Sequence, residues 1–159
     1  MPRVNPIPEH FTSITPALVV PDVAAAREWY QRAFHATEHA HLNSADGARV
    51  IQAHLRIGDA MFTLNEQAPD AGLYPPLSYG GTPVTIHLYV ADVDALWRDV
   101  MALQVTVLFP LQDVYWGDRY GKFADPFGHH WSVASRRRDL KPEEIQERAE
   151  KVFGIHQEE

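Results

Sequence analysis

The sequence contains one pattern twice, and the two copies are offset by 70 residues. The shared residues of the first copy are Thr15, Leu18, Val20, Asp22, Val23, Ala25 and Gly58. Their counterparts in the second copy are Thr85, Leu88, Val90, Asp92, Val93, Ala95 and Gly128. A repeat of this length indicates a duplicated supersecondary module that buries its apolar face with its twin. A cleft between two half-sheets is a natural place to hold a small molecule, so the repeat points to a ligand site there.

Length and composition are those of an ordinary globular protein. The 159 residues, 45% of them hydrophobic, suffice for one domain with a buried core. The formal net charge of -7 disfavours attraction to nucleic acid or to an anionic membrane, so neither is expected as a partner. The absence of cysteine excludes disulfides, thiolate metal sites and a cysteine nucleophile. The first 13 residues hold three prolines and no apolar run, so we expect no signal peptide and a soluble cytoplasmic protein.

Alternation and turn signals predict the order βαβββ in the first copy. Asp22 is placed to cap a helix over about 23–34, directly after a β-rich stretch. Glycine- and asparagine-containing turns then separate three further strands. The expected strands are 14–20, 36–42, 50–56 and 60–64. Residues 67–83, rich in proline and glycine, form the linker to the second copy.

The second copy repeats this order. Asp92 caps a helix over about 93–103, and a long loop over 110–117 separates two of the later strands. The expected strands are 84–90, 105–109, 120–123 and 130–134. Pro142 suits the first turn of a short amphipathic helix over 142–153, which we expect to cover the domain or a partner subunit.

The doubled pattern resembles the vicinal oxygen chelate superfamily, which includes glyoxalases, bleomycin-resistance proteins and extradiol dioxygenases. The likeness covers about residues 12–136, and residues 114–132, with W-G-D-R-x-G followed by D-P-F-G-H-x-W, look like the PhnB-like branch. The resemblance implies an α+β fold in which two tandem βαβββ modules form a curved, cleft-like mixed sheet. It implies a single domain over 1–159, with module one at about 12–66, linker 67–83, module two at about 84–136 and a C-terminal helix at about 142–153.

The metal ligands of such relatives lie on the first and last strands of each module, usually as His, Gln or Glu. Counting from the capping aspartates and from the two glycines gives Thr15, Thr85, Phe62 and Ser132 at these positions. Two threonines, a serine and a phenylalanine cannot supply the charged or imidazole ligands that a divalent cation needs. The usual metal site is therefore absent, and no cofactor is expected.

Strand alternation nevertheless brings histidines to the same side as these positions. If Thr85 faces the cleft, so do His87 and Tyr89, and His130 accompanies Ser132. The same rule turns His54 to the cleft side of its strand. This leaves open a displaced site in which His54, His87 and His130 hold one divalent metal ion, although no local ligand motif supports it. Half-buried histidines that are satisfied by a neighbour are the competing interpretation.

Aromatic side chains are expected to form apolar walls of the cleft. Trp116 and Tyr120 lie in and after the long loop, whereas helical or strand periodicity assigns Trp29, Trp97 and Trp131 to the core. Asp118 and Arg119 are expected to form a structural pair that tethers the loop, and Lys122 lies where it reaches either the cleft or solvent. The expected ligand-binding residues are Thr15, Phe62, Thr85, His87, Tyr89, Trp116, Tyr120, His130 and Ser132.

These observations favour a metal-independent protein that binds or sequesters an apolar or aromatic small molecule in the inter-module cleft, as bleomycin-resistance relatives do. The alternative is a metal-dependent isomerase, lyase or dioxygenase of the superfamily that uses the displaced histidine site. Acid–base catalysis by a pocket histidine without metal is a third possibility. The resemblance also implies a homodimer. Neither the ligand nor the presence of a reaction follows from the sequence.

Overall fold

The computed structural model describes residues 4–154, which form two compact units. Unit 1 consists of the residues up to Pro83 together with Pro126–His129, and unit 2 consists of Val84–Asp125 and the residues from His130 onward. The division before Val84 coincides with the expected start of module two. Each unit contains one open, four-stranded mixed sheet, which confirms the predicted α+β class and the βαβββ order of both modules.

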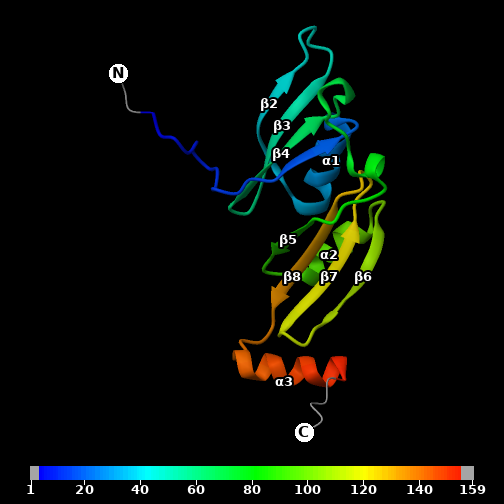
Figure 1. The fold of residues 1–159 in the computed structure, drawn as a ribbon. Helices are drawn as coiled ribbons and strands as arrows, with labels where there is room; N and C mark the ends of the chain where they lie inside the picture. Colours follow the sequence, from blue (N-terminus) through cyan, green and yellow to red (C-terminus); the bar gives the residue numbers. More distant parts are fainter. Residues whose placement is uncertain (1–3, 155–159) are drawn as a thin grey trace. The chain divides into compact units, whose positions relative to one another are not determined.

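Unit 1 carries its sheet in the order β1-β4-β3-β2, with β1 parallel to β4 and the other neighbours antiparallel. Helix α1 packs against β3 and β4 and covers one face of the sheet (Figure 1). The elements are β1 (Ala17–Val20), α1 (Val23–Phe34), β2 (Thr37–Asn43), β3 (Val50–Ile57) and β4 (Ala60–Glu66). Strand β1 is shorter than expected: it begins at Ala17, although the Pro16 carbonyl still accepts the Thr63 N–H of β4 at 2.9 Å.

Both module helices begin where the sequence predicts. The Asp22 carboxylate accepts a hydrogen bond from the backbone N–H of Ala25 at 3.0 Å, and Asp92 does the same for Ala95 at 3.0 Å. Each bond satisfies an N–H group that lacks a partner inside the helix. The two capping aspartates therefore fix the direction in which the backbone leaves the first strand of each module.

The linker and the 126–129 segment both belong to unit 1. The linker contains two short 3₁₀ helices, η1 (Pro69–Ala71) and η2 (Pro76–Tyr79). Phe127 packs near Tyr30 of α1, with ring centroids 6.0 Å apart, and the His129 Nε2–H donates to the Val19 carbonyl at 2.9 Å. Gly128 has φ +88, and a Cβ there would lie 2.8 Å from the Leu77 side chain, so only glycine fits.

Unit 2 carries its sheet in the order β5-β8-β7-β6, with β5 parallel to β8. Helix α2 packs against β7 and β8, and α3 lies across the end of the sheet where β6 and β7 are joined (Figure 1). The elements are β5 (Thr85–Tyr89), α2 (Val93–Met101), β6 (Thr106–Asp113), β7 (Asp118–Ala124), β8 (His130–Arg136) and α3 (Pro142–Phe153). No helix among residues 4–154 is long and apolar enough to cross a membrane.

The first half of the long loop expected over 110–117 is strand. Strand β6 continues through Pro110 to Asp113, and only residues 114–117 form the turn to β7. A proline is tolerated here because β6 is the edge of the sheet and its pairing with β7 is irregular between Phe109 and Gln112. Trp116 therefore lies in a tight turn instead of a long loop.

The repeat does not keep its offset to the end of each module. Leu18 pairs with Leu64, whereas its counterpart Leu88 pairs with Val133, so the last strands are offset by 69 residues. The strand turns explain the slip, because Gly58 begins a two-residue turn whereas Gly128 is the fourth residue of a five-residue connection. A one-residue slip in a strand exchanges its two faces. The counterpart of Ser132 is therefore Thr63, and the expected match with Phe62 is wrong.

Gly121 permits the close approach of α2 to the second sheet. A Cβ at this position would lie 2.5 Å from the indole ring of Trp97, and Trp97 also meets Phe123 edge-on at 6.0 Å. The expected structural role of Trp97 agrees with this packing. The helix side of the second sheet is thus marked by Gly121 and Phe123, with Trp131 and Val133 beside them on β8.

We expect Gly121→Ala to destabilise the protein by about 1–3 kcal/mol, because the added methyl group displaces the rigid indole of Trp97. Urea unfolding of the wild type and the variant measures the loss. In a Trp97→Leu background the same substitution is expected to cost distinctly less, since the obstructing ring is gone. Equal costs in the two backgrounds would contradict this account of the helix packing.

Candidate ligand-binding face

The face of the second sheet opposite α2 gathers most of the sequence-predicted residues of module two. His87 pairs with Ser132 in the parallel ladder, and Tyr89 pairs with Ala134, which in turn faces Tyr120 of β7. Thr85 and His130 form a further pair on this side. Directly paired residues share a face of a sheet, so alternation assigned this side of β5, β7 and β8 correctly. We call its ring-bearing part the aromatic face, consisting of His87, Tyr89, Phe109, Trp116 and Tyr120.

The rings of the aromatic face contact one another in sequence across the sheet. Tyr120 lies at the centre: it stacks on His87 at 5.9 Å and meets Trp116 and Phe109 edge-on at 5.3 and 5.6 Å. His87 also meets Tyr89 edge-on at 4.7 Å. Tyr89 remains 58% exposed, so this cluster presents aromatic surface to solvent instead of closing on itself as a core does.

A buried carboxylate holds the aromatic face in place. Asp118 is 1% exposed, and its Oδ2 accepts hydrogen bonds from the Tyr89 hydroxyl at 2.7 Å and the Trp116 indole N–H at 2.9 Å. Its Oδ1 accepts from Nε of Arg136 at 3.3 Å. The hydrogen bond to Asp118 raises the pKa of Tyr89, because a phenolate beside a carboxylate is unfavourable. Tyr89 therefore stays a donor, and three segments of the chain are tied to one side chain.

His87 provides the polar centre of the face. Its Nδ1 lies 2.7 Å from the hydroxyl of Ser132, which is 2% exposed. Desolvation lowers the pKa of His87, and the Asp118 charge only partly opposes this effect. The imidazole is consequently neutral at physiological pH, with Nε2 available to a ligand as a hydrogen-bonding group. The buried Ser132 orients the ring.

Two expected ligand residues, Phe62 and Thr15, belong to unit 1. Phe62 is 4% exposed and meets Tyr30 of α1 edge-on at 5.3 Å, so it belongs to the helix side of the first sheet. Thr63, which pairs with His54, occupies the opposite side. Thr15 precedes β1, and its hydroxyl donates to the Thr12 carbonyl at 3.2 Å. The one-residue slip of the repeat accounts for the wrong placement of Phe62.

The histidines of the displaced-metal hypothesis have other neighbours. His54 of unit 1 meets Phe11 edge-on at 5.4 Å, whereas His87 of unit 2 bonds Ser132. His130 pairs with Thr85 at the start of β8. Within the described part of the chain, no three His, Cys, Asp or Glu side chains group together as a metal site.

Asp118 and Arg119 do not form the expected pair. Adjacent strand residues point to opposite faces, and Arg119 bonds Asp94 of α2 at 2.7 Å and Asp113 at 3.2 Å, whereas Asp118 bonds Arg136. Sequence reasoning also missed Phe109 and Asp118 as parts of the site. Counting back two residues from Tyr120 would have placed Asp118 on the ligand side. Lys122 shares that side, because it pairs with Ser132.

The glyoxalase/bleomycin resistance protein/dioxygenase superfamily model matches residues 9–133. The chain belongs to this superfamily. Rv0887c of Mycobacterium tuberculosis, an uncharacterized relative, is 44% identical over 137 residues, covering 84% of this chain and 80% of its own.

Solved structures of the superfamily show the same fold. FosX of Listeria monocytogenes, a fosfomycin resistance protein complexed with Mn(II) and sulfate, aligns with a TM-score of 0.61 at 18% identity, over 87% of this chain and 97% of its own. The PhnB protein of Bacillus cereus aligns with a TM-score of 0.60 at 16% identity, over 78% of this chain and 99% of its own. These two alignments show the shared fold alone. The match of the family model confirms the recognition of a vicinal oxygen chelate protein from the sequence.

We expect Asp118→Asn to lower the free energy of unfolding by about 1–3 kcal/mol, because the amide presents a donor where the carboxylate accepted. The Trp116 indole N–H signal should shift in the NMR spectrum at the same time. Asp113→Asn is the matched control, since Asp113 is exposed and its surface ion pair contributes about 1 kcal/mol or less. Equal effects of the two substitutions would contradict the role given to Asp118.

We expect the His87 imidazole to titrate below its ordinary value of 6.5. As the pH falls below that value, the unfolded chain takes up a proton that the folded protein resists, so stability is lost on acidification. The wild type should therefore lose more stability than His87→Gln between about pH 7.5 and about pH 5.5. NMR titration of the ring protons gives the midpoint directly, and a midpoint at or above 6.5 would contradict the prediction.

Proposed function

We propose that this chain binds an apolar or aromatic small molecule on the aromatic face of unit 2 and needs no metal ion to do so. The observation that carries the proposal is the exposed ring cluster anchored by the buried Asp118 carboxylate. Rings held at fixed positions offer flat apolar surface at little cost in conformational entropy. Sequestration of a compound requires only such a surface and a few polar anchors.

The polar groups of the face support a neutral ligand. His87 is uncharged at physiological pH because desolvation lowers its pKa, and the Asp118 charge is shared among three donors. The open Nε2 of His87 and the partly exposed Lys122 flank Tyr120 and can orient a ligand hydroxyl or carbonyl. A planar compound with one oxygen function, lying against Tyr120, fits this arrangement best.

Binding of 2-naphthol, followed by NMR of the indole N–H groups, tests the proposal. We expect Tyr120→Ala to weaken binding about tenfold, because loss of a central stacking ring removes roughly 1–1.5 kcal/mol. The matched control is Tyr79→Ala, which removes a tyrosine that is 70% exposed on the unit 1 linker. Equal losses in the two variants, or no shift of the Trp116 signal, would refute binding at the aromatic face.

The alternative is a divalent-metal enzyme that uses His54, His87 and His130. FosX of Listeria monocytogenes, which shares the fold, was complexed with Mn(II). Elemental analysis of protein purified without chelator separates the two proposals, together with 2-naphthol binding before and after chelation. We expect binding to be unchanged by chelation. Stoichiometric metal that is lost in His87→Ala would favour the enzyme instead.

Cytoplasmic location and homodimerisation also remain part of the proposal. The superfamily resemblance supports the dimer, as do the exposed apolar side chains of the linker, among them Leu77 and Tyr79, which are 64% and 70% exposed. Apolar surface of this kind is commonly covered by a partner subunit.

A further inference from the structure

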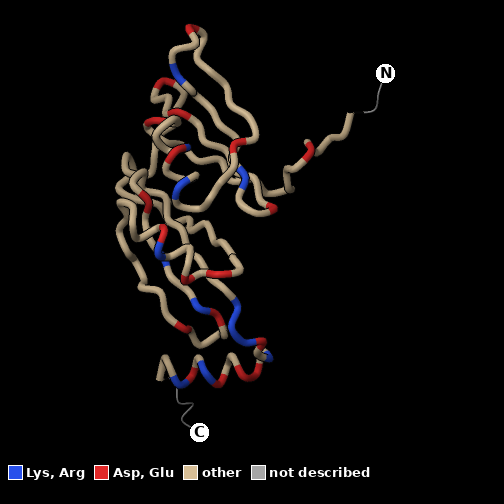
Figure 2. The backbone as a smooth tube through the Cα atoms, turned by 180° about the vertical axis from the view of Figure 1, so that it is seen from behind, with Lys and Arg blue, Asp and Glu red and all other residues tan. Residues whose placement is uncertain are grey.

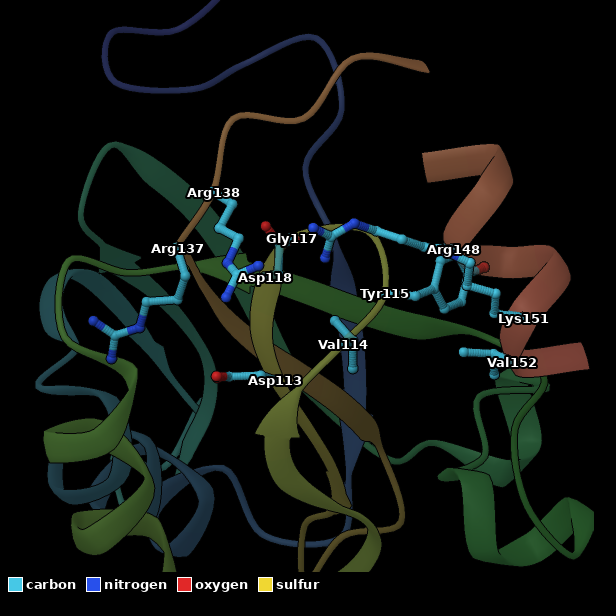
Figure 3. Close-up of a pocket in the computed structure, with 10 residues that line it drawn as sticks. All are labelled: Asp113, Val114, Tyr115, Gly117, Asp118, Arg137, Arg138, Arg148, Lys151 and Val152. Atoms are coloured by element: carbon cyan, nitrogen blue, oxygen red, sulfur yellow. The ribbon is translucent and has the colours of Figure 1, made fainter. Parts of the chain in front are cut away.

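Unit 2 also contains a hollow beside the β6–β7 turn, next to the Trp116 end of the ring cluster. A cavity of about 370 Å³, open to solvent, is bordered by the β6–β7 turn, the segment after β8 and one side of α3 (Figure 3). Four basic residues line it: Arg137, Arg138, Arg148 and Lys151. We call it the basic cavity. Cationic side chains rarely converge in a chain of net charge -7 without a reason, because their mutual repulsion opposes it.

The carboxylates that line the basic cavity are already engaged. Asp118 accepts from Tyr89, Trp116 and Arg136, and Asp113 pairs with Arg119 at 3.2 Å. Both oxygens of Asp118 thus bond groups other than the cavity's own cations, and the exposed Asp113 forms its ion pair with Arg119.

The basic residues divide into one that is paired and three that are not. Arg137 pairs with Asp94 at 2.7 Å. For Arg138, Arg148 and Lys151 the described residues 4–154 supply no carboxylate within ion-pair distance. None of these three cations therefore forms an ion pair within residues 4–154, and the cavity lining holds four basic residues against two carboxylates, Asp113 and Asp118. Basic and acidic residues are interspersed along α3 itself (Figure 2). An anion would complete the site.

The backbone fixes where these cations lie. The Gly117 carbonyl accepts the backbone N–H groups of both Arg137 and Arg138 at 2.9 Å. Gly117 has φ +98, and a Cβ there would lie 2.7 Å from the Arg138 carbonyl, so the turn requires glycine. Figure 3 shows the guanidinium groups of Arg138 and Arg148 extending toward Gly117 from opposite sides.

Helix α3 is held against the turn by its own contacts. The Glu144 carboxylate accepts the Lys141 backbone N–H at 2.9 Å at the start of the helix, and Tyr115 meets Phe153 edge-on at 5.6 Å near its end. Arg148 and Lys151 are three residues apart and therefore lie on the same side of α3. The ring of Tyr115 also lines the cavity, so the site combines cationic and apolar walls.

We propose that the basic cavity binds a soluble phosphate monoester that carries a small apolar or aromatic group. Two guanidinium forks and an ammonium group suit the dianionic oxygens of a phosphate, and Tyr115 and Val152 suit the apolar part. The volume lies within the range of small-molecule sites. This site differs in position and in charge from the aromatic face, so it does not depend on the proposed function.

Titration of the full-length protein with phenyl phosphate, followed by calorimetry and NMR at low salt, tests the proposal. We expect Arg148→Gln and Arg138→Gln each to weaken binding about tenfold or more, since each removes charge-assisted hydrogen bonds. Arg98→Gln, an exposed position on α2 outside the cavity, changes the net charge equally and should alter affinity less than about twofold. Unchanged circular dichroism of each variant excludes unfolding as the cause.

Two further measurements distinguish specific binding by the cavity residues from an adventitious ion only. Arg138→Lys keeps the positive charge but loses the planar guanidinium that can donate two hydrogen bonds at once. We therefore expect its affinity for phenyl phosphate to lie between those of the wild type and Arg138→Gln. Inorganic phosphate should bind more weakly than phenyl phosphate, because it does not use the Tyr115 wall. Equal weakening by Arg98→Gln and the cavity variants, or no detectable binding of phenyl phosphate at low salt, would overturn the proposal. Binding of 2-naphthol serves as the independent readout of the aromatic face.

Discussion

The buried carboxylate of Asp118 is the interaction on which unit 2 depends most. Burying a charge is costly unless hydrogen bonds compensate it, and here the donors come from β5, from the β6–β7 turn and from β8. The same bonds fix the orientation of Tyr89 and Trp116. The aromatic face is therefore a consequence of satisfying one charge, and its geometry is set more rigidly than apolar contact alone would allow.

Much of the fold was predictable because it rests on short-range physics. Asp22 and Asp92 cap their helices in the way their positions suggest, and α3 begins at Pro142 and ends at Phe153 as expected. The alternation of β5 and β8 placed His87 and Ser132 on one side correctly. In each case neighbouring residues decide the outcome, through a cap, a fixed φ or the two-residue period of a strand.

The sequence-based predictions were wrong where contacts between residues distant in sequence determine the structure. The two modules differ in the length of the turn before the last strand, and no local signal shows that Gly58 and Gly128 stand at different places in their turns. Phe62 was consequently assigned to the wrong face. The partner of Asp118 is Arg136 and not the adjacent Arg119, because strand geometry separates neighbours and brings β7 beside β8. Ion-pair partners on neighbouring strands can be assigned only when the pairing of the strands is known.

Asp118 also links two chemically different surfaces of unit 2. It anchors Trp116 on the aromatic face and lines the basic cavity, where Tyr115, the neighbour of Trp116 at 4.9 Å, forms part of the wall. The aromatic face carries a neutral His87, whereas the cavity carries three cations without a carboxylate partner among the described residues. Because the same carboxylate holds Tyr89 and Trp116 and also lines the cavity, the geometry of both surfaces depends on how its buried charge is satisfied.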